Sequence, residues 1–216
     1  MGIKTCFLKI NPINRIRKIN NRKRLKNSDI SIIASNCLGG LIYNDLGLRF
    51  MSPTINLRFD SKQFVKFVLN MEYYLQQEIC FVPSEEPFPV GLLDDITVCF
   101  VHYKTVEEAR RKWEERKKRI NPEKLFILLN DCDGVDEKDL ELLDQSEYEN
   151  IAVFTSKESY SKYKCACFLP CYQGQEHVGN VMIKSWVTGA MKVEHEFDFI
   201  GWFNQERGQG VQQYRV

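Results

Sequence analysis

The sequence lacks any apolar run near the roughly 20 residues that a helix needs to cross a bilayer. No apolar segment of the kind found in signal peptides follows the N-terminal charges. Eight cysteines in 216 residues are too few for a disulfide scaffold. These absences exclude a membrane-spanning helix and a disulfide-stapled secreted protein. We therefore expect a cytoplasmic protein, peripheral at the inner membrane face if it binds lipid.

Phosphate-binding glycine motifs are also missing. Neither GxGxxG nor GxxxxGK[ST] follows any of the expected strands, which argues against dinucleotide-binding and P-loop proteins. The sequence indicates no particular cofactor. Hydrophobic residues make up 44% and charged residues 27% of the chain, a balance typical of a globular domain.

Acidic residues are absent near the N-terminus. Nine lysines and arginines and no acid lie between residues 4 and 26, although the whole chain carries a formal charge of only +1. We predict a basic arm of residues 1–28 followed by a single domain of residues 29–216. Such an arm either binds an anionic membrane or acidic protein, or is simply solvated. Because no aromatic residues are interleaved with its basic core, no nucleic-acid partner is expected.

Apolar runs of strand length alternate with amphipathic segments along the chain. We predict strands at 30–35, 97–103, 125–130 and 150–155, and helices at 37–46, 61–78, 105–120, 137–143 and 181–191. This alternation is typical of βαβ units. It predicts a single α/β domain with a three-layer, mostly parallel, Rossmann-like sheet and helices on both faces.

Ligands of such folds bind beyond the carboxyl ends of the strands, so the residues that follow the strands are informative. Those residues are Asn36, Cys37, His102, Tyr103, Asp131 and Asp133. If the strands are parallel neighbours, these side chains converge at one edge of the sheet. We predict the functional site there.

Cys37 is the strongest candidate for a catalytic role. A helix N-terminus favours a thiolate, and His102 would act as general base in covalent acyl chemistry. Asn36 or nearby backbone N–H groups would stabilise an oxyanion, and Gly39 and Gly40 would let a substrate approach closely. The alternative is that Cys37 is a packed residue and that the glycines permit close helix contact.

Several other residues are candidates for orienting the imidazole or binding substrate. Asp94, Asp95 and Asp131 could orient His102, and Tyr103 could contact the substrate. Asp131 and Asp133 could instead hold Mg²⁺ against the diphosphate of a nucleotide sugar, or form an ordinary Asx turn.

Three stretches of the sequence, residues 35–59, 89–121 and 125–134, resemble a bacterial family labelled exopolysaccharide biosynthesis protein. The resemblance runs from about residue 30 to the end and omits the basic arm. It implies a cytoplasmic protein that acts on surface-polysaccharide assembly, with a sugar or glycan precursor as substrate. The layout around Cys37 and His102 is also similar to uncharacterised papain-like cysteine peptidases, whose Cys and His these two residues match.

Three functional hypotheses follow. The first is a transferase of exopolysaccharide or capsule biosynthesis that transfers an acyl group through Cys37 and His102. The second is a metal-dependent glycosyl- or phosphotransferase that uses a nucleotide sugar. The third is a non-catalytic factor whose basic arm docks on a membrane or a protein.

Overall fold

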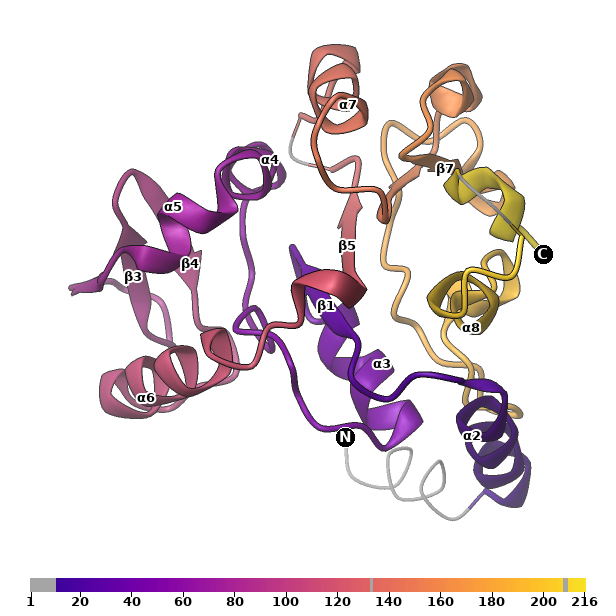
Figure 1. Cartoon of the computed structure of the whole chain (residues 1–216), viewed down its shortest axis with the longest axis horizontal. Helices are drawn as coiled ribbons and strands as arrows, with labels where there is room; N and C mark the ends of the chain where they lie inside the picture. The colour runs from indigo at the N-terminus through magenta and orange to yellow at the C-terminus, as the bar shows by residue number, and fades with distance from the viewer. Residues whose placement is uncertain (1–10, 133, 208–209) are drawn as a thin grey trace.

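A computed structural model describes residues 11–132, 134–207 and 210–216 (Figure 1). A parallel sheet has the strand order β1-β5-β6-β7, and an antiparallel sheet has the order β2-β3-β4. The parallel strands are β1 (Ser31–Ala34), β5 (Leu125–Asn130), β6 (Ile151–Thr155) and β7 (Ala166–Phe168). The antiparallel strands are β2 (Ile79–Val82), β3 (Val90–Leu93) and β4 (Ile96–Cys99). The α/β class predicted from the sequence is confirmed.

Seven helices are assigned in the described part of the chain, with short 3-10 turns between some of them. They are α2 (Pro12–Arg24), α3 (Leu38–Leu46), α4 (Ser61–Leu69), α5 (Met71–Gln76), α6 (Val106–Lys117), α7 (Glu137–Asp144) and α8 (Phe199–Phe203). Thr105 and Asp136 cap α6 and α7 with their side chains, as short polar residues do at helix N-termini.

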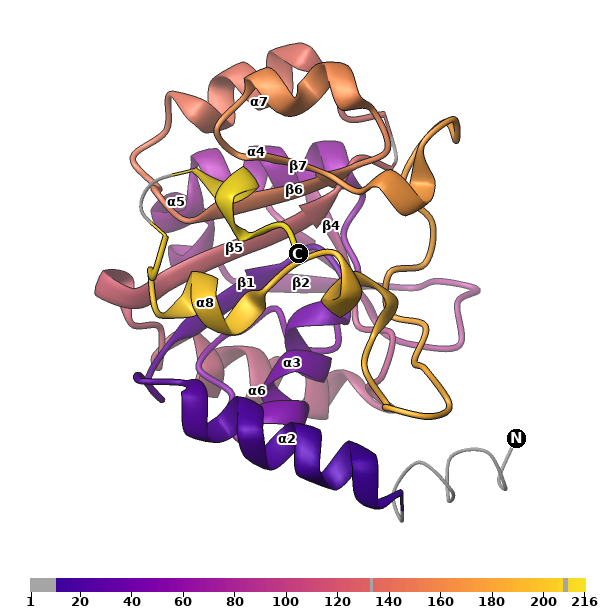
Figure 2. The same ribbon diagram turned by 90° about the vertical axis from the view of Figure 1, so that its right-hand side faces the viewer.

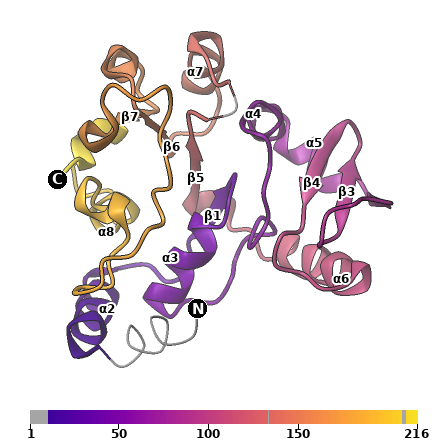
Figure 3. The same ribbon diagram turned by 180° about the vertical axis from the view of Figure 1, so that it is seen from behind.

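The parallel sheet is buried on both faces because its strands are almost entirely apolar. All six residues of β5 are buried. Ile127 and Leu129 belong to one core with α4, α5 and α7, whereas Phe126 and Leu128 belong to a second core with α3 and α8. This alternation places the sheet between two helical layers, with the antiparallel sheet farther out on the α4 side (Figures 1 and 3).

A short extended segment joins the two sheets. The Phe59 amide donates to the Ser35 carbonyl at 2.9 Å, and Arg58 exchanges two backbone hydrogen bonds with Cys99 at 2.9 and 3.0 Å. Arg58 thus lies between β1 and β4. The antiparallel sheet is therefore attached to the β1 edge of the parallel sheet.

The strand predicted at 97–103 was wrong in length and in direction of pairing. The observed strand, β4, ends at Cys99 because Val101 and His102 form a turn. It pairs with β3 in the antiparallel sheet. The helix predicted at 61–78 is interrupted at Asn70, whose backbone (φ −132°, ψ 36°) ends α4 and precedes α5.

Residues 181–191 do not form the predicted helix. Lys184 and Met191 form an antiparallel bridge, and the Ser185 amide donates to the Ala190 carbonyl at 2.8 Å. Gly189 has a φ of +69°, a left-handed conformation that an α-helix does not accommodate. The segment is a tight turn instead.

The described part of the predicted basic arm is folded. Helix α2 begins after Asn11, whose side chain accepts a hydrogen bond from the Ile13 amide, and it packs against α3. In Figure 2 it lies along the lower edge of the molecule. No helix in the described ranges is long and apolar enough to cross a membrane.

Candidate functional site

Cys37 lies where the sequence places it, immediately before α3 at the carboxyl end of β1. The N-cap of α3 is Cys37 itself, and the carboxamide oxygen of the preceding Asn36 accepts a hydrogen bond from the Leu38 amide at 2.9 Å. Cys37 is partly buried, and this burial raises the pKa of its thiol. Burial thus opposes the thiolate that the position of Cys37 at the helix N-terminus is expected to favour.

His102 does not share an edge of the parallel sheet with Cys37. It is exposed in the turn after β4, and within residues 11–132, 134–207 and 210–216 no hydrogen bond or ion pair connects it to the Cys37 thiol. The next residue, Tyr103, is buried; its hydroxyl donates to the Ile55 carbonyl at 2.8 Å and accepts from Arg116. Tyr103 is thus a packing residue rather than one poised to contact substrate.

Gly39 and Gly40 allow α3 to pack closely against β1 and the loop that contains Ile55 and Asn56. A Cβ on Gly39 would lie 3.1 Å from the Ala34 Cβ, and one on Gly40 would lie 3.0 Å from Asn56 Oδ1. Both distances are shorter than ordinary carbon contacts. The prediction that these glycines make room for a substrate is not supported, because the space is already filled by β1 and the loop before Leu57.

Asp94 and Asp95 lie in the turn between β3 and β4, at the opposite end of β4 from His102. The Tyr73 hydroxyl donates to Asp94 at 2.8 Å, and Asp95 pairs with Lys66. Because β4 alone rises roughly 10 Å between its ends, neither carboxylate is placed to orient the imidazole.

Asp131 is buried at the carboxyl edge of the sheet, and both of its carboxylate oxygens accept hydrogen bonds. Its Oδ2 accepts from Thr155 Oγ1 at 2.8 Å and from the Ser156 amide at 2.9 Å, and its Oδ1 accepts from the Val178 amide at 2.6 Å. These bonds brace β5, β6 and the later chain, which argues against Asp131 as a magnesium ligand. Asp133 lies outside the described residues.

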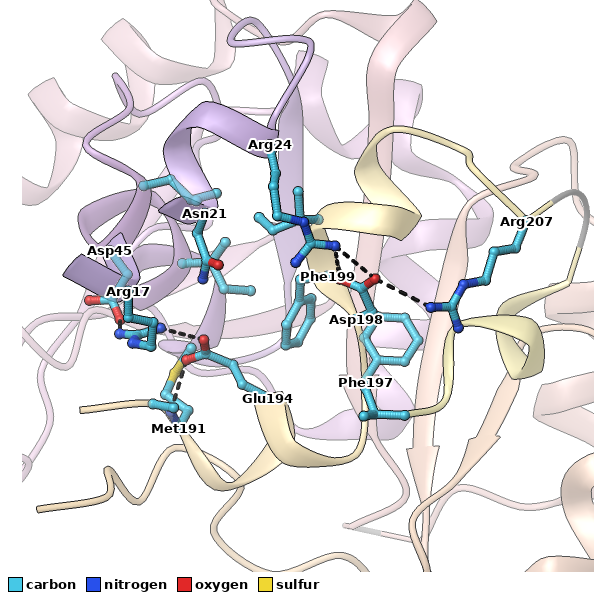
Figure 4. Close-up of a pocket in the computed structure, with 15 residues that line it drawn as sticks. Arg17, Asn21, Arg24, Asp45, Met191, Glu194, Phe197, Asp198, Phe199 and Arg207 are labelled. Carbon is cyan, nitrogen blue, oxygen red and sulfur yellow. Dashed lines mark hydrogen bonds and ion pairs between the residues drawn. The ribbon is translucent and has the colours of Figure 1, made fainter. Parts of the chain in front are cut away.

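A different site is visible as a cavity of about 340 Å³ at the other end of α3. It opens between α2, α3 and residues 190–200 (Figure 4). Asp45 lines this cavity and follows Cys37 by eight positions, a distance of roughly 12 Å along a helix. Most of its lining is apolar: Ile42, Leu46, Ala190, Met191, Phe197, Phe199, Ile200 and Val216.

Arg17 organises the charges at one side of this cavity. Its guanidinium lies 2.6 Å from Asp45 and also pairs with Glu194. Lys18 and Lys184 approach the same Asp45 carboxylate at 2.9 and 3.0 Å. Every one of these links joins α2 or α3 to a distant part of the chain.

The two carboxyl groups that share Arg17 titrate differently. Burial alone would raise the pKa of Asp45, but its bonds to Lys18 and Arg17 and the charge of Lys184 outweigh that effect and lower it. Burial dominates at Glu194 and raises its pKa, despite the Met191 amide and Arg17. Carboxyl groups with opposite shifts in one cavity are a recurring feature of functional sites.

Arg24 and Arg207 lie on the opposite side of the cavity and approach Asp198 from two directions (Figure 4). Arg24 Nη2 lies 3.1 and 3.0 Å from the two Asp198 oxygens, and Arg207 Nη2 lies 3.6 Å from Oδ2. Both arginine side chains are about half exposed, at 51% and 47%. Guanidinium groups at the rim of an apolar cavity are suited to bind a phosphate or carboxylate.

Sequence reasoning missed this cavity. Arg17 and Arg24 belong to the segment read as a solvated basic arm, and nothing local connects that segment to Glu194, Asp198 or Arg207. The spacing of Ile13, Ile16 and Ile19 in the sequence would instead favour a helix that buries its isoleucines, so no local signal showed that this helix packs through polar side chains.

Comparison with known proteins places the chain in a family. A family model described as "Domain of unknown function (DUF1919)" matches residues 10–204, a range that includes α2 and every residue of the cavity except Arg207 and Val216. The chain is also similar to an uncharacterized protein of Haemophilus influenzae, at 35% identity over 206 residues, with 90% of this chain and 99% of the relative covered. This protein therefore belongs to the DUF1919 family of domains of unknown function.

Proposed function

We propose that this protein is a cytoplasmic transferase of bacterial surface-polysaccharide assembly that binds an anionic, partly apolar glycan precursor in the cavity between α2, α3 and α8. The cavity itself is the observation that carries the proposal. It combines an apolar floor with two half-exposed guanidinium groups, those of Arg24 and Arg207. A precursor with a phosphate or carboxylate and an apolar part matches both features.

Arg24 is the residue best placed to bind the anion. Within the described ranges it contacts Asp198 only through Nη2, so Nε and Nη1 keep their hydrogen-bonding capacity. A guanidinium has five N–H donors in a planar arrangement that fits a phosphate or carboxylate. Arg17 is a different case, because its donors are committed to Asp45, Glu194 and the carbonyls of residues 188 and 189.

Group transfer is the reaction class that suits such a ligand, because a phosphate ester provides a leaving group. Glu194 is the residue in the cavity suited to exchange a proton during transfer, since burial raises its pKa. The resemblance to exopolysaccharide proteins supports the choice of a glycan precursor. We favour this function over acyl transfer by Cys37 because burial raises the pKa of that thiol.

Thermal unfolding with a ligand panel tests the proposal. The panel contains UDP-sugars, sugar 1-phosphates and a short polyprenyl phosphate, with free sugars and the uncharged prenyl alcohol as neutral counterparts. A ligand at 100 times its Kd stabilises the folded state by about 2.7 kcal/mol, which is roughly 5–10 °C for a chain of this size. We expect at least one anionic compound to raise the Tm and its neutral counterpart to raise it less.

Two arginine variants locate the binding. Arg24→Gln should weaken binding of the stabilising compound by ~tenfold or more. Arg111→Gln, on the exposed face of α6, removes the same charge away from the cavity and should bind normally. The proposal fails if no anionic compound raises the Tm, or if the two variants bind equally well.

A further inference from the structure

Helix α2 is amphipathic in the reverse of the usual sense. A helix on the surface of a globular protein normally buries its apolar residues and exposes its polar ones. In α2 the buried residue is Asn14 and the ion-paired Arg17 lies on the same side, whereas Ile13, Ile16 and Ile19 are 49%, 58% and 44% exposed. Residues three apart lie on one side of a helix, so the isoleucines form a single outward stripe.

A second group of exposed apolar side chains lies in a turn that is attached to the start of α2. Asn11 Nδ2 donates to the carbonyls of Trp186 and Val187 at 3.2 and 2.6 Å, which ties the turn of residues 183–189 to the start of α2. Ile183, Trp186 and Val187 are 58%, 53% and 62% exposed. Together the two groups hold six of the eleven exposed large apolar residues in the described ranges. We call Ile13, Ile16, Ile19, Ile183, Trp186 and Val187 the α2 patch.

The helix that carries the α2 patch is strongly basic. Arg15, Arg22 and Lys23 are exposed on α2, and no ion pair neutralises them in the part of the chain that the structure describes. No aspartate or glutamate occurs between residues 4 and 26. The surface therefore combines branched apolar side chains, a tryptophan and uncompensated positive charge.

We propose that the α2 patch docks on the surface of an anionic lipid bilayer, with α2 lying in the plane of the interface. Isoleucines would enter the boundary between headgroups and acyl chains, while arginine and lysine side chains reach the lipid phosphates, as in interfacial amphipathic helices. Trp186 fits the same boundary, where tryptophan is enriched. The positive charge favours an anionic membrane over a neutral apolar partner.

This docking goes beyond the proposed function and uses different residues. The α2 patch residues do not line the cavity, whereas Arg17, Asn21 and Arg24 on the inner side of α2 do. Docking through the outer side would hold the cavity next to the membrane. Because the cavity is tested with Arg24→Gln and the patch with isoleucine variants, failure of one proposal is distinguishable from failure of the other.

Vesicle binding by the full chain tests the proposal. We expect the wild-type protein to sediment with vesicles that contain phosphatidylglycerol but not with pure phosphatidylcholine, and high salt should weaken the binding. The double variant Ile16→Asp/Ile19→Asp should bind ~tenfold or more weakly. Leu142→Asp, at a 40% exposed position of α7 on the opposite side of the molecule (Figure 2), is the matched control and should bind as the wild type does.

Tryptophan fluorescence of the wild-type protein provides a second readout, independent of the isoleucine variant. Trp113 and Trp202 are buried, at 1% and 3% exposure, whereas Trp186 is 53% exposed. Anionic vesicles should therefore shift the wild-type emission to shorter wavelength, and Trp186→Phe should abolish the shift.

Four results would overturn the proposal: no sedimentation of the wild type, equal sedimentation of the isoleucine variant and Leu142→Asp, equal binding to neutral vesicles, or an unchanged emission spectrum. Dimerisation that the isoleucine substitutions abolish, without vesicle binding, would instead assign the α2 patch to contact between two copies of the chain.

Discussion

Asp45 is the residue on which the anchoring of α2 most depends. Its carboxylate is only 8% exposed and lies within 3.0 Å of three cations, Arg17, Lys18 and Lys184. Asp45→Asn keeps the shape of the side chain but removes the charge. Among the residues that the structure describes, it leaves Arg17, itself 14% exposed, with Glu194 as its one ionic partner.

The magnitude follows from burial. Removing one partner of a buried ion pair costs about 3–5 kcal/mol. Asparagine retains one acceptor oxygen, and Lys18 is 35% exposed and can return to water. We therefore expect Asp45→Asn to lower the free energy of unfolding by about 2–3 kcal/mol near neutral pH, a large part of the 5–15 kcal/mol typical of a folded domain.

The pH dependence of this loss can be predicted in sign. The folded-state pKa of Asp45 lies below its ordinary value of 3.8. The carboxylate thus contributes stability that is complete well above pH 3.8 and is lost as the pH falls through the folded-state pKa. The difference between wild type and Asp45→Asn should accordingly be constant at neutral pH and shrink in acid.

Urea denaturation at several pH values measures both effects, with Asp95→Asn as the control. Asp95 also pairs with a lysine, Lys66, but both side chains are about half exposed, so water and salt screen the pair and its loss should leave the unfolding midpoint nearly unchanged. A loss below about 1 kcal/mol for Asp45→Asn, or one equal to that of Asp95→Asn, would refute the view that this carboxylate anchors α2.

Two further predictions concern the residues around Cys37. Because burial raises the pKa of its thiol, Cys37 should react with iodoacetamide at neutral pH more slowly than a free thiol and than the exposed Cys80. Mass spectrometry of the labelled peptides measures these rates. Labelling of Cys37 faster than a free thiol would restore the nucleophile hypothesis. Gly39→Ala should destabilise the protein by about 1–3 kcal/mol in urea denaturation, because the new Cβ would lie 3.1 Å from Ala34 and 3.3 Å from Ile32. A variant as stable as the wild type would mean that space remains there for a ligand.

Much of the fold could be predicted because the relevant signals are local. Residues 125–129 are all apolar and only Asn130 is polar, so this short run favours a strand buried on both faces, and it is β5. Thr105 and Asp136 are N-cap residues at the predicted helix starts. The sheet to which a strand belongs could not be predicted in this way. The composition of residues 97–99 suits a parallel strand and an antiparallel strand equally, and only the pairing with β3 shows that this strand is antiparallel.

The candidate site was predicted poorly because it depends on contacts between distant residues. The convergence expected at the strand ends required His102 to follow a parallel strand, and β4 is antiparallel. Asp131 does lie at the carboxyl edge, but it is buried and its two oxygens accept hydrogen bonds from Thr155, Ser156 and Val178. The ion pair of Arg17 with Glu194 spans 177 positions of sequence, a separation at which periodicity and motifs carry no information.

That long span also constrains the order in which the chain becomes structured during synthesis. Helix α2 emerges from the ribosome early, yet the carbonyls of residues 186–189 and the Glu194 carboxylate that hold it in place are translated more than 170 residues later. A short isolated helix is marginal in water, so α2 depends at first on its contacts with α3 and Asp45. Its anchoring is completed only when nearly the whole polypeptide has been made, because distant contacts form last. Truncation before residue 186 would consequently leave α2 with its contacts to α3 and Asp45 but without the later carbonyls and Glu194, although β1, β5 and β6 would already be complete in sequence.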